Sequence, residues 1–177
     1  MWSRILAGEV AQPGSFSLRT LNVVKALSKA DADRFVRLCS TIWATYDEVL
    51  LPLIFDTGTL LQYTQIRLGF EDLGRVEEAG LIKREFPGVQ MNFDKPDVHL
   101  YLSYFGKAIV AGKTNNPKLA LNYGLVSLTS PGQELAKIAT AVPDEDFRLA
   151  SIEKIRSHGW SVVDFNPAIH GTPPPRA

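Results

Sequence analysis

Apolar residues near the N-terminus recur at helical spacing. They predict one helix over residues 2–10 and an amphipathic helix over residues 18–27, with Ser15 or Ser17 as the N-cap of the second. The stripe of the second helix consists of Leu18, Leu21, Val24 and Leu27, widened by Val23. Residues at every third position lie on one side of a helix, so this side is expected to face a core.

A third helix is predicted to start at Ser28. Asp31 stands close to the position that completes a capping box, and its charge favours the N-terminal end of a helix. The apolar face of this helix is predicted to consist of Phe35, Leu38, Cys39, Ile42 and Trp43. Short polar turns join the three helices, so we expect a small antiparallel helical cluster over residues 1–45.

The pattern in the middle of the chain is mixed. It is ambiguous over residues 46–55, helical over residues 60–68, and helical again over residues 71–79. The inward face of the last of these helices is predicted to carry Phe70, Leu73 and Val76. Gly80 follows at the position of a left-handed C-cap residue, so the helix is expected to end there.

Beyond residue 81 the apolar period changes toward two. Short segments rich in strand-forming residues occupy 98–102, 107–111 and 124–128, while Pro87 and Gly88 indicate a loop. These segments predict a small antiparallel sheet.

The last third of the chain returns to helical spacing. Thr129 is the expected N-cap of a helix over residues 131–140, and an acidic start predicts a further helix over residues 144–158. Residues 160–165 are expected to form a final strand. The fold class is therefore predicted as α+β, with residues 46–167 as the second domain and residues 168–177 as a disordered tail.

Composition is ordinary for a globular protein. Of 177 residues, 45% are hydrophobic and 21% are charged, and the formal net charge is zero. No apolar run approaches the roughly 20 residues that a membrane-spanning helix needs. The N-terminus also lacks the pattern of a secretory signal, so we expect a cytoplasmic protein without a membrane partner.

Residues with reactive side chains are few and dispersed. The only cysteine, Cys39, falls on a predicted core stripe, and His99, His158 and His170 are far apart in the sequence. Phosphate-binding glycine motifs and a nucleophile elbow are absent from the sequence. Adjacent carboxylates lie in predicted helical first turns or on exposed helix faces, where solvation explains them. We therefore predict no catalytic, cofactor-binding or metal-binding residues and no cofactor.

The order of the predicted elements resembles a winged helix. Two helices are followed by strands, and a segment similar to junctions of winged-helix regulators then opens a helix with Leu128, Thr129, Gly132, Glu134 and Leu135. The helix at the recognition position carries four acidic residues and one arginine, a charge that would repel DNA. Contact with DNA or a partner is therefore expected to use basic residues of the wing, namely Lys83, Arg84, Lys107 and Lys113.

A block near the N-terminus resembles a known bacterial family, the domain of unknown function 2806. The similar segments are Trp2-Ser3-Arg4-Ile5-Leu6-Ala7-Gly8-Glu9, Pro13-Gly14-Ser15-Phe16-Ser17 and Arg19-Thr20-Leu21, followed by Asp31-Ala32 and Phe35. The similarity is looser at Gly80-Leu81-Ile82 and over residues 128–135. The resemblance implies a bacterial origin and no established activity. Members of the family usually carry a longer region before the tryptophan, which suggests a truncated or misassigned start of this chain.

These observations favour one function and leave two alternatives open. The favoured hypothesis is a non-enzymatic interaction or regulatory module that binds a protein partner or associates with itself. The first alternative is a regulator that binds duplex DNA through its basic wing. The second is an enzyme subunit whose site needs a missing segment or another subunit.

Overall fold

The computed structural model describes residues 14, 16–93, 97–113 and 119–165. Its helices are α2 (Leu18–Ala26), α3 (Lys29–Cys39), the 3-10 helix η1 (Gly58–Gln62), α4 (Phe70–Glu78), α5 (Ser130–Ala136) and α6 (Glu145–Ser157). Its strands are β1 (Ile42–Thr45), β2 (Leu50–Pro52), β3 (Ile82–Phe93), β4 (Val98–Tyr104), β5 (Lys107–Lys113), β6 (Leu119–Leu128) and β7 (Ser161–Asp164). The predicted helix over residues 2–10 and the predicted tail lie outside the described residues.

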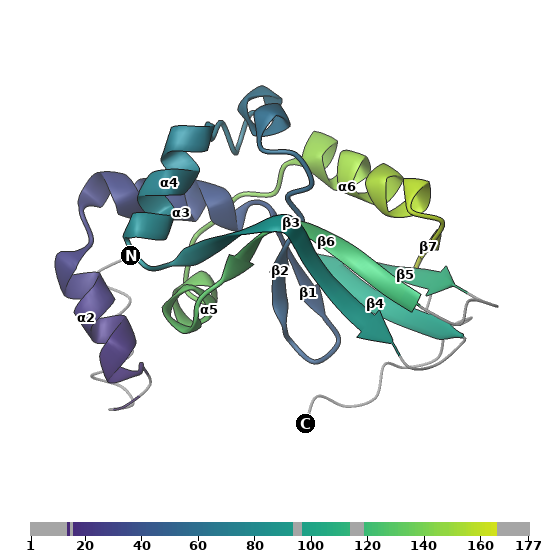
Figure 1. The fold of residues 1–177 in the computed structure, drawn as a ribbon, viewed down its shortest axis with the longest axis horizontal. Coiled ribbons are helices and arrows are strands. Elements are labelled where there is room, and N and C mark those ends of the chain that lie inside the picture. Colours follow the sequence, from purple (N-terminus) through teal and green to yellow (C-terminus); the bar gives the residue numbers. More distant parts are fainter. Residues whose placement is uncertain (1–13, 15, 94–96, 114–118, 166–177) are drawn as a thin grey trace.

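Two antiparallel sheets organise the described part of the chain. One sheet has five strands in the order β2-β1-β4-β5-β7, and the other is a two-stranded ribbon of β3 and β6. In Figure 1, helices α2 to α5 gather at one end of the molecule, and α6 lies near β5 and β7. This combination of helices and antiparallel sheets confirms the α+β class. No helix within the described ranges is long and apolar enough to span a bilayer.

Polar caps start the helices where the sequence predicts them. The side chains of Ser17, Ser28, Thr129 and Asp144 each accept a hydrogen bond from the backbone N–H three residues later. Gly80 has a φ of 77°, as expected for a left-handed residue after α4. These caps satisfy backbone groups that the helix itself leaves without partners, so local sequence determines these helix boundaries.

The third predicted helix is too long. Helix α3 ends at Cys39, and Ile42 and Trp43 belong to strand β1, where Trp43 pairs with Leu51 of β2. Trp43 is fully buried, and its ring lies 5.1 Å from the ring of Tyr104. Tertiary packing against the neighbouring strands therefore overrides the helical spacing of these two residues.

Two further predictions for the middle of the chain are wrong. Residues 60–68 do not form an α-helix, because η1 ends at Gln62 and Arg67 adopts a positive φ of 44°. Arg37 of α3 donates a hydrogen bond to the carbonyl of Arg67 at 2.9 Å, which holds this irregular segment against α3. Phe70 does not face inward, since 59% of it is exposed and its ring lies 4.7 Å beneath the guanidinium of Arg84.

Strand β3 runs through the predicted loop at Pro87 and Gly88. The register of β3 with β6 shifts between Arg84 and Val89, so the two residues lie in a bulge. A bulge tolerates proline, which has no N–H for the ladder, and Gly88 adopts a φ of 135° that favours glycine. Pro87 and Gly88, which predicted a loop, therefore lie inside strand β3 and not in a connection between two strands.

Residues from both predicted domains build one hydrophobic core. Phe35 and Leu38 of α3 belong to the same buried cluster as Leu73, Leu102 and Ile155 of later elements. The packing therefore shows that the segments before and after residues 45 and 46 share buried surface. The domain boundary between them stays a prediction.

A close backbone contact joins α5 to the end of α4. Thr129 donates from its backbone N–H to the carbonyl of Leu81 at 3.0 Å and from its hydroxyl to the carbonyl of Gly80 at 2.6 Å. Gly132, in the first turn of α5, faces the Leu81 carbonyl so closely that a Cβ at this position would overlap the oxygen. A residue without a side chain is therefore required where α5 packs on this turn.

Two glycine-to-alanine substitutions should have opposite effects on stability. Gly132→Ala should destabilise the fold by about 1–3 kcal/mol, because the added methyl group meets fixed backbone. Gly74→Ala in α4 should stabilise it by about 0.5–1 kcal/mol, because the nearest atom to a Cβ there is 3.9 Å away and alanine favours helix. Urea unfolding of the two variants measures both effects, and a neutral Gly132→Ala would contradict the close contact.

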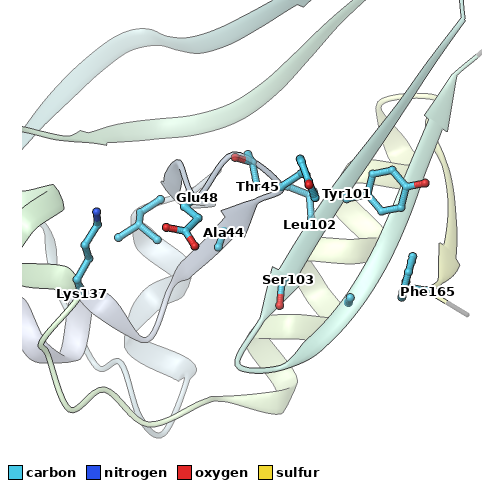
Figure 2. A pocket seen from close by; sticks show the side chains of 11 residues that line it. Ala44, Thr45, Glu48, Tyr101, Leu102, Ser103, Lys137 and Phe165 are labelled. Carbon is cyan, nitrogen blue, oxygen red and sulfur yellow. The ribbon is translucent and has the colours of Figure 1, made fainter. Parts of the chain in front are cut away.

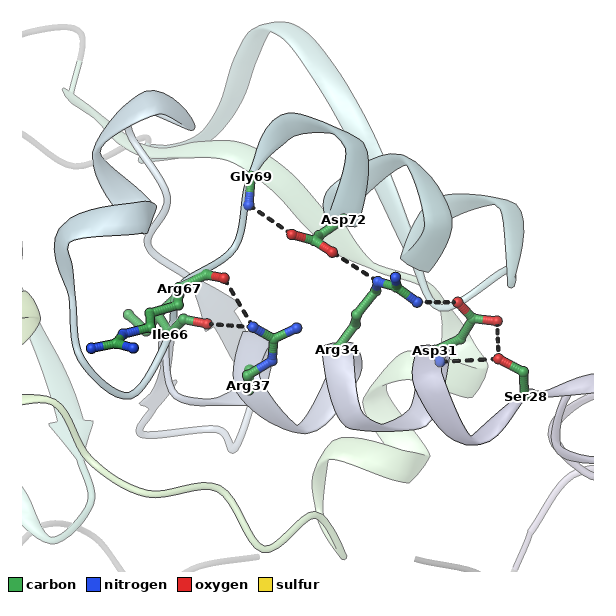
Figure 3. Close-up of polar contacts among 8 residues, drawn as sticks. All are labelled: Ser28, Asp31, Arg34, Arg37, Ile66, Arg67, Gly69 and Asp72. Atoms are coloured by element: carbon green, nitrogen blue, oxygen red, sulfur yellow. Dashed lines mark hydrogen bonds and ion pairs between the residues drawn. The ribbon is translucent and has the colours of Figure 1, made fainter.

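Charged residues fix α3 against the start of α4 (Figure 3). Arg34 of α3 donates to the carboxylate of Asp72 at 2.8 Å and to that of Asp31 at 3.1 Å. Asp72 also accepts from the backbone N–H of Gly69 at 2.9 Å, so it caps α4 and pairs with α3 at once. The Gly69 N–H and then the Arg34 guanidinium lower the pKa of Asp72 below its usual value.

Removing the Asp72 carboxylate should destabilise the packing of α3 on α4. Asp72→Ala should lower the free energy of unfolding by about 1–2 kcal/mol near pH 7, because a cap and a charged hydrogen bond are lost together. Since the folded protein lowers the pKa of Asp72, the difference should be full above the unfolded pKa and shrink as the pH falls below it. Asp33→Ala, at an exposed position of α3, removes the same charge and should change stability by less than about 0.5 kcal/mol.

Candidate functional site

A row of small side chains crosses the centre of the five-stranded sheet. Ala44 of β1 pairs with Ser103 of β4, and Ser103 pairs with Ala108 of β5. The row continues to Leu50, which pairs with Ala44, and to Phe165, whose N–H donates to the Ala108 carbonyl at 2.9 Å. Paired residues point to the same side of a sheet, so three small side chains lie between two bulky ones. We call this side the outer face.

This row forms the floor of a pocket of about 450 Å³, the outer pocket (Figure 2). Its lining consists of Ala44, Thr45, Tyr46, Glu48, Leu50, Tyr101, Leu102, Ser103, Ala108, Lys137 and Phe165. One end is aromatic, with the Tyr101 ring 6.5 Å from that of Tyr46 and 5.7 Å from that of Phe165. Glu48 and Lys137 lie away from the Tyr101 and Phe165 end, so the pocket combines an apolar body with charged groups at its rim.

A second hollow of about 220 Å³ adjoins the outer pocket. The two share Ala44, Leu50, Ser103 and Lys137, and the second extends along β4 to Phe105. Phe105 adopts a positive φ of 45° at the turn between β4 and β5 and is 44% exposed. An aromatic residue rarely occupies this backbone region, so the turn holds the ring beside the hollow in a strained conformation.

Local hydrogen bonds place the two charged residues of the rim. Glu48 lies in the turn between β1 and β2, which the Thr45 hydroxyl closes by accepting from the N–H of Val49 at 3.1 Å. Lys137 is the C-cap of α5, and the side chain of Gln133 in that helix donates to the Leu50 carbonyl at 3.0 Å. The position of the lysine therefore depends on the contact of α5 with β2.

The inner face of the sheet supports the pocket from behind. The Tyr104 hydroxyl donates to the Ser40 carbonyl at 2.8 Å and accepts from the N–H of Asp144 at 2.8 Å. These bonds tie β4 to the end of α3 and the start of α6. Burial raises the pKa of Tyr104 to about 12, so the phenol stays neutral and keeps donating across the physiological range.

Two titratable groups outside the outer pocket have pKa shifts that burial or ion pairing explains. Desolvation raises the pKa of Cys39 far above its usual value, which leaves a neutral and weakly nucleophilic thiol. Arg148 and then Lys107 lower the pKa of Glu145 to about 2. Among the residues that the structure describes, no group of three or more His, Cys, Asp or Glu could hold a metal ion.

The basic residues predicted for partner contact come from two different sheets. Lys83 and Arg84 lie in β3 of the ribbon, whereas Lys107 and Lys113 lie at the two ends of β5 in the other sheet. The ends of this strand are about 20 Å apart at the usual rise per residue. The sequence had grouped the four residues on one wing, whereas the structure places two of them in each sheet, and their role in partner contact stays a prediction.

Three of these side chains already bind other groups of the protein. Arg84 pairs with Glu77 at 2.6 Å, and Lys107 pairs with Glu145 at 2.9 Å. Lys113 donates to the His158 carbonyl at 3.0 Å. These contacts reduce the positive charge that a DNA phosphate would meet at each position.

Sequence reasoning missed the residues of the outer pocket. Ala44, Ser103 and Ala108 are unremarkable in the sequence because small residues on separate strands carry no shared motif. They form a floor only through the pairing of β1, β4 and β5, which comes from tertiary structure. Two signals were available, the aromatic residues at 46 and 101, but they are equally compatible with a buried core.

Comparison with known proteins identifies the family. A family model described as "Protein of unknown function (DUF2806)" matches residues 1–150. The chain belongs to this family. Searches of curated proteins and of solved structures gave no match. The DUF2806 match confirms the resemblance drawn from the N-terminal block, and its span includes every residue of the outer pocket except Phe165.

His158 should make the stability of this DUF2806 protein depend on pH. The Nδ1 atom of His158 is buried and has no hydrogen-bond partner among the described residues, and the ring lies 5.7 Å from that of Phe55. Desolvation, then Lys154 and Lys113, lower its pKa, so the folded state binds fewer protons than the unfolded state. Stability should therefore fall as the pH drops through and below the unfolded value near 6.5.

Two histidine variants measure this contribution. His158→Gln should flatten the dependence of the unfolding midpoint on pH between about 7 and 5, because the buried titrating group is gone. His99→Gln changes the same residue type at an exposed position of β4 and should keep the wild-type dependence. A His158→Gln profile that is identical to the wild type would contradict the assignment.

Proposed function

We propose that this chain is an interaction module that binds a partner through the outer pocket. The observation that carries the proposal is the floor of Ala44, Ser103 and Ala108, a hollow at the centre of a sheet face. Its volume of about 450 Å³ falls within the range of binding pockets, and its lining is mainly apolar with a few polar groups. Helix α6 packs on the opposite face, where the Phe147 ring lies 6.3 Å from that of Tyr104.

The order of elements supports a winged-helix-like arrangement as part of this proposal. Helix α4 leads directly into β3, the ribbon partner β6 leads into α5, and α3 packs beside α4. The charge of α4 supports a protein partner over DNA, because Glu71 and Glu78 are exposed. The nearby Arg84 pairs with Glu77. The DNA alternative would be favoured instead if the chain bound duplex DNA in a salt-sensitive way and Lys107→Glu and Lys113→Glu weakened that binding.

Site-specific photo-crosslinking tests the interaction module. A photoreactive benzoylphenylalanine at position 137, on the rim of the pocket, should form adducts in cells of the source organism. The same residue at position 90, exposed on β3, should form none there. Adducts with another protein or with a second copy of the chain both support the function.

A variant in which a larger side chain fills the outer pocket is the control for the crosslinking experiment. Ser103→Leu adds two heavy atoms to the floor and should reduce the adducts at position 137 by about tenfold or more, since truncated or blocked hot spots cost over 1 kcal/mol. The thermal midpoint of this variant must be measured alongside. Adducts that form equally at positions 137 and 90, or that persist in a folded Ser103→Leu protein, would reject the proposal.

A further inference from the structure

We infer that His158 is a pH-sensitive switch, whose protonation loosens strand β7 and with it the Phe165 wall of the outer pocket. The switch follows from the surroundings of the His158 ring and from the short connection between His158 and Phe165. Its consequence for partner binding rests on the proposed function, whereas the loosening of β7 does not.

The surroundings of the His158 ring suit its neutral form. The ring packs edge-on against Phe55, with 5.7 Å between the ring centroids, and its Nδ1 atom is buried without a hydrogen-bond partner in the part of the chain that the structure describes. An imidazolium carries an N–H on both ring nitrogens, so protonation in place would leave a buried donor unpaired. A buried donor without an acceptor costs free energy, which favours release of the ring.

The charges around the ring add to this cost. Desolvation lowers the pKa of His158 most, followed by Lys154, one turn earlier in α6, and Lys113 from β5. The segment after β2 contributes the uncharged ring of Phe55, and the carboxylate of the following Asp56 accepts from a backbone N–H at 2.8 Å. The C-terminal end of α6 favours a cation, but the pKa is nevertheless lowered, so burial and the two positive charges outweigh the helix end.

Lys113 also connects His158 to β7. Its ammonium group donates to the His158 carbonyl at 3.0 Å and lies 5.6 Å from the centre of the Trp160 ring. One side chain of β5 therefore holds the turn that leads from the end of α6 into β7 (Figure 1). A positive charge on His158 repels this ammonium group, so protonation acts on the contact that fixes the start of β7.

Strand β7 is held less firmly than the centre of the sheet. It stands at the end of the strand order, pairs with β5 alone among the described strands, and has exposed side chains at three of its four positions. Elements with few buried contacts open at a lower free energy than the core. Phe165 follows β7 directly, and its ring lies 5.7 Å from that of Tyr101 in the lining of the outer pocket. A loosened β7 therefore removes one wall of the pocket.

The direction of the pH effect follows from proton binding. With β7 in place the pKa of His158 is lowered, so the loosened state binds more protons. Loosening is therefore suppressed well above the unfolded pKa near 6.5 and grows as the pH falls through that value and below it. The outer pocket keeps its Phe165 wall at neutral pH and loses it in acid.

Amide hydrogen exchange on the full chain, resolved by NMR, tests the switch. Between about pH 7.5 and 5.5, and after correction for intrinsic exchange rates, the protection of the β7 and Phe165 amides relative to the β4 amides should fall about fivefold. His158→Gln should keep this ratio within about twofold, because the titrating group is gone. His99→Gln, at an exposed position of β4, should behave like the wild type. An equal loss across β4 and β7, or the same fall in His158→Gln, would overturn the switch.

A charge change outside the turn tests the mechanism while the histidine stays intact. Lys154→Gln removes one of the two positive charges at an exposed position, so the fall in relative protection should shrink to about threefold or less. Lys25→Gln makes the same change at an exposed position of α2 and should leave the wild-type fall unchanged. A fall in Lys154→Gln that equals that of the wild type would contradict the mechanism.

The exchange experiment and the crosslinking experiment can fail separately. If adducts form at position 137 but the protection of β7 does not depend on His158, the switch is overturned and the interaction module stands. If β7 responds to His158 but no adducts form, the switch stands and its consequence for binding fails together with the proposed function.

Discussion

Side chains along β4 alternate between the two faces of the sheet, and this alternation links the buried core to the outer pocket. Leu102 and Tyr104 point to the inner face and are almost fully buried, while Tyr101 and Ser103 point to the outer face. Because the side-chain period of a strand is two, the burial of Tyr104 determines that Ser103 lies in the pocket floor. A shift of one residue would place a serine in the core and a tyrosine in the pocket.

The buried hydroxyl of Tyr104 holds this register. Its bonds to the backbone of Ser40 and Asp144 join the sheet to α3 and α6, so three elements meet at one polar atom. A buried hydroxyl that lost these partners would carry a desolvation cost, which opposes any slip of β4. The inner face therefore supplies the rigidity that a preformed pocket on the outer face requires.

Electrostatics in this protein serve mainly to connect neighbouring elements. Arg34 links α3 to α4 through Asp72, Arg84 links β3 to α4 through Glu77, and Lys107 links β5 to α6. These pairs are partly exposed and individually contribute little to stability. Two of them engage a basic side chain that the sequence made a candidate for partner contact, namely Arg84 and Lys107. Glu48 and Lys137, which the sequence did not single out, lie instead at the rim of the hollow.

Sequence alone determined the helix caps at Ser17, Ser28 and Thr129, most of the strands, the α+β class and the DUF2806 family. These features follow from interactions within a few residues or from direct sequence similarity. Tertiary structure decided that Trp43 lies in a strand, that Lys83 and Lys107 belong to different sheets, and that Ala44, Ser103 and Ala108 form one floor. The physical reason is that strand pairing joins residues far apart in the chain, and local spacing carries no information about which strands will be neighbours.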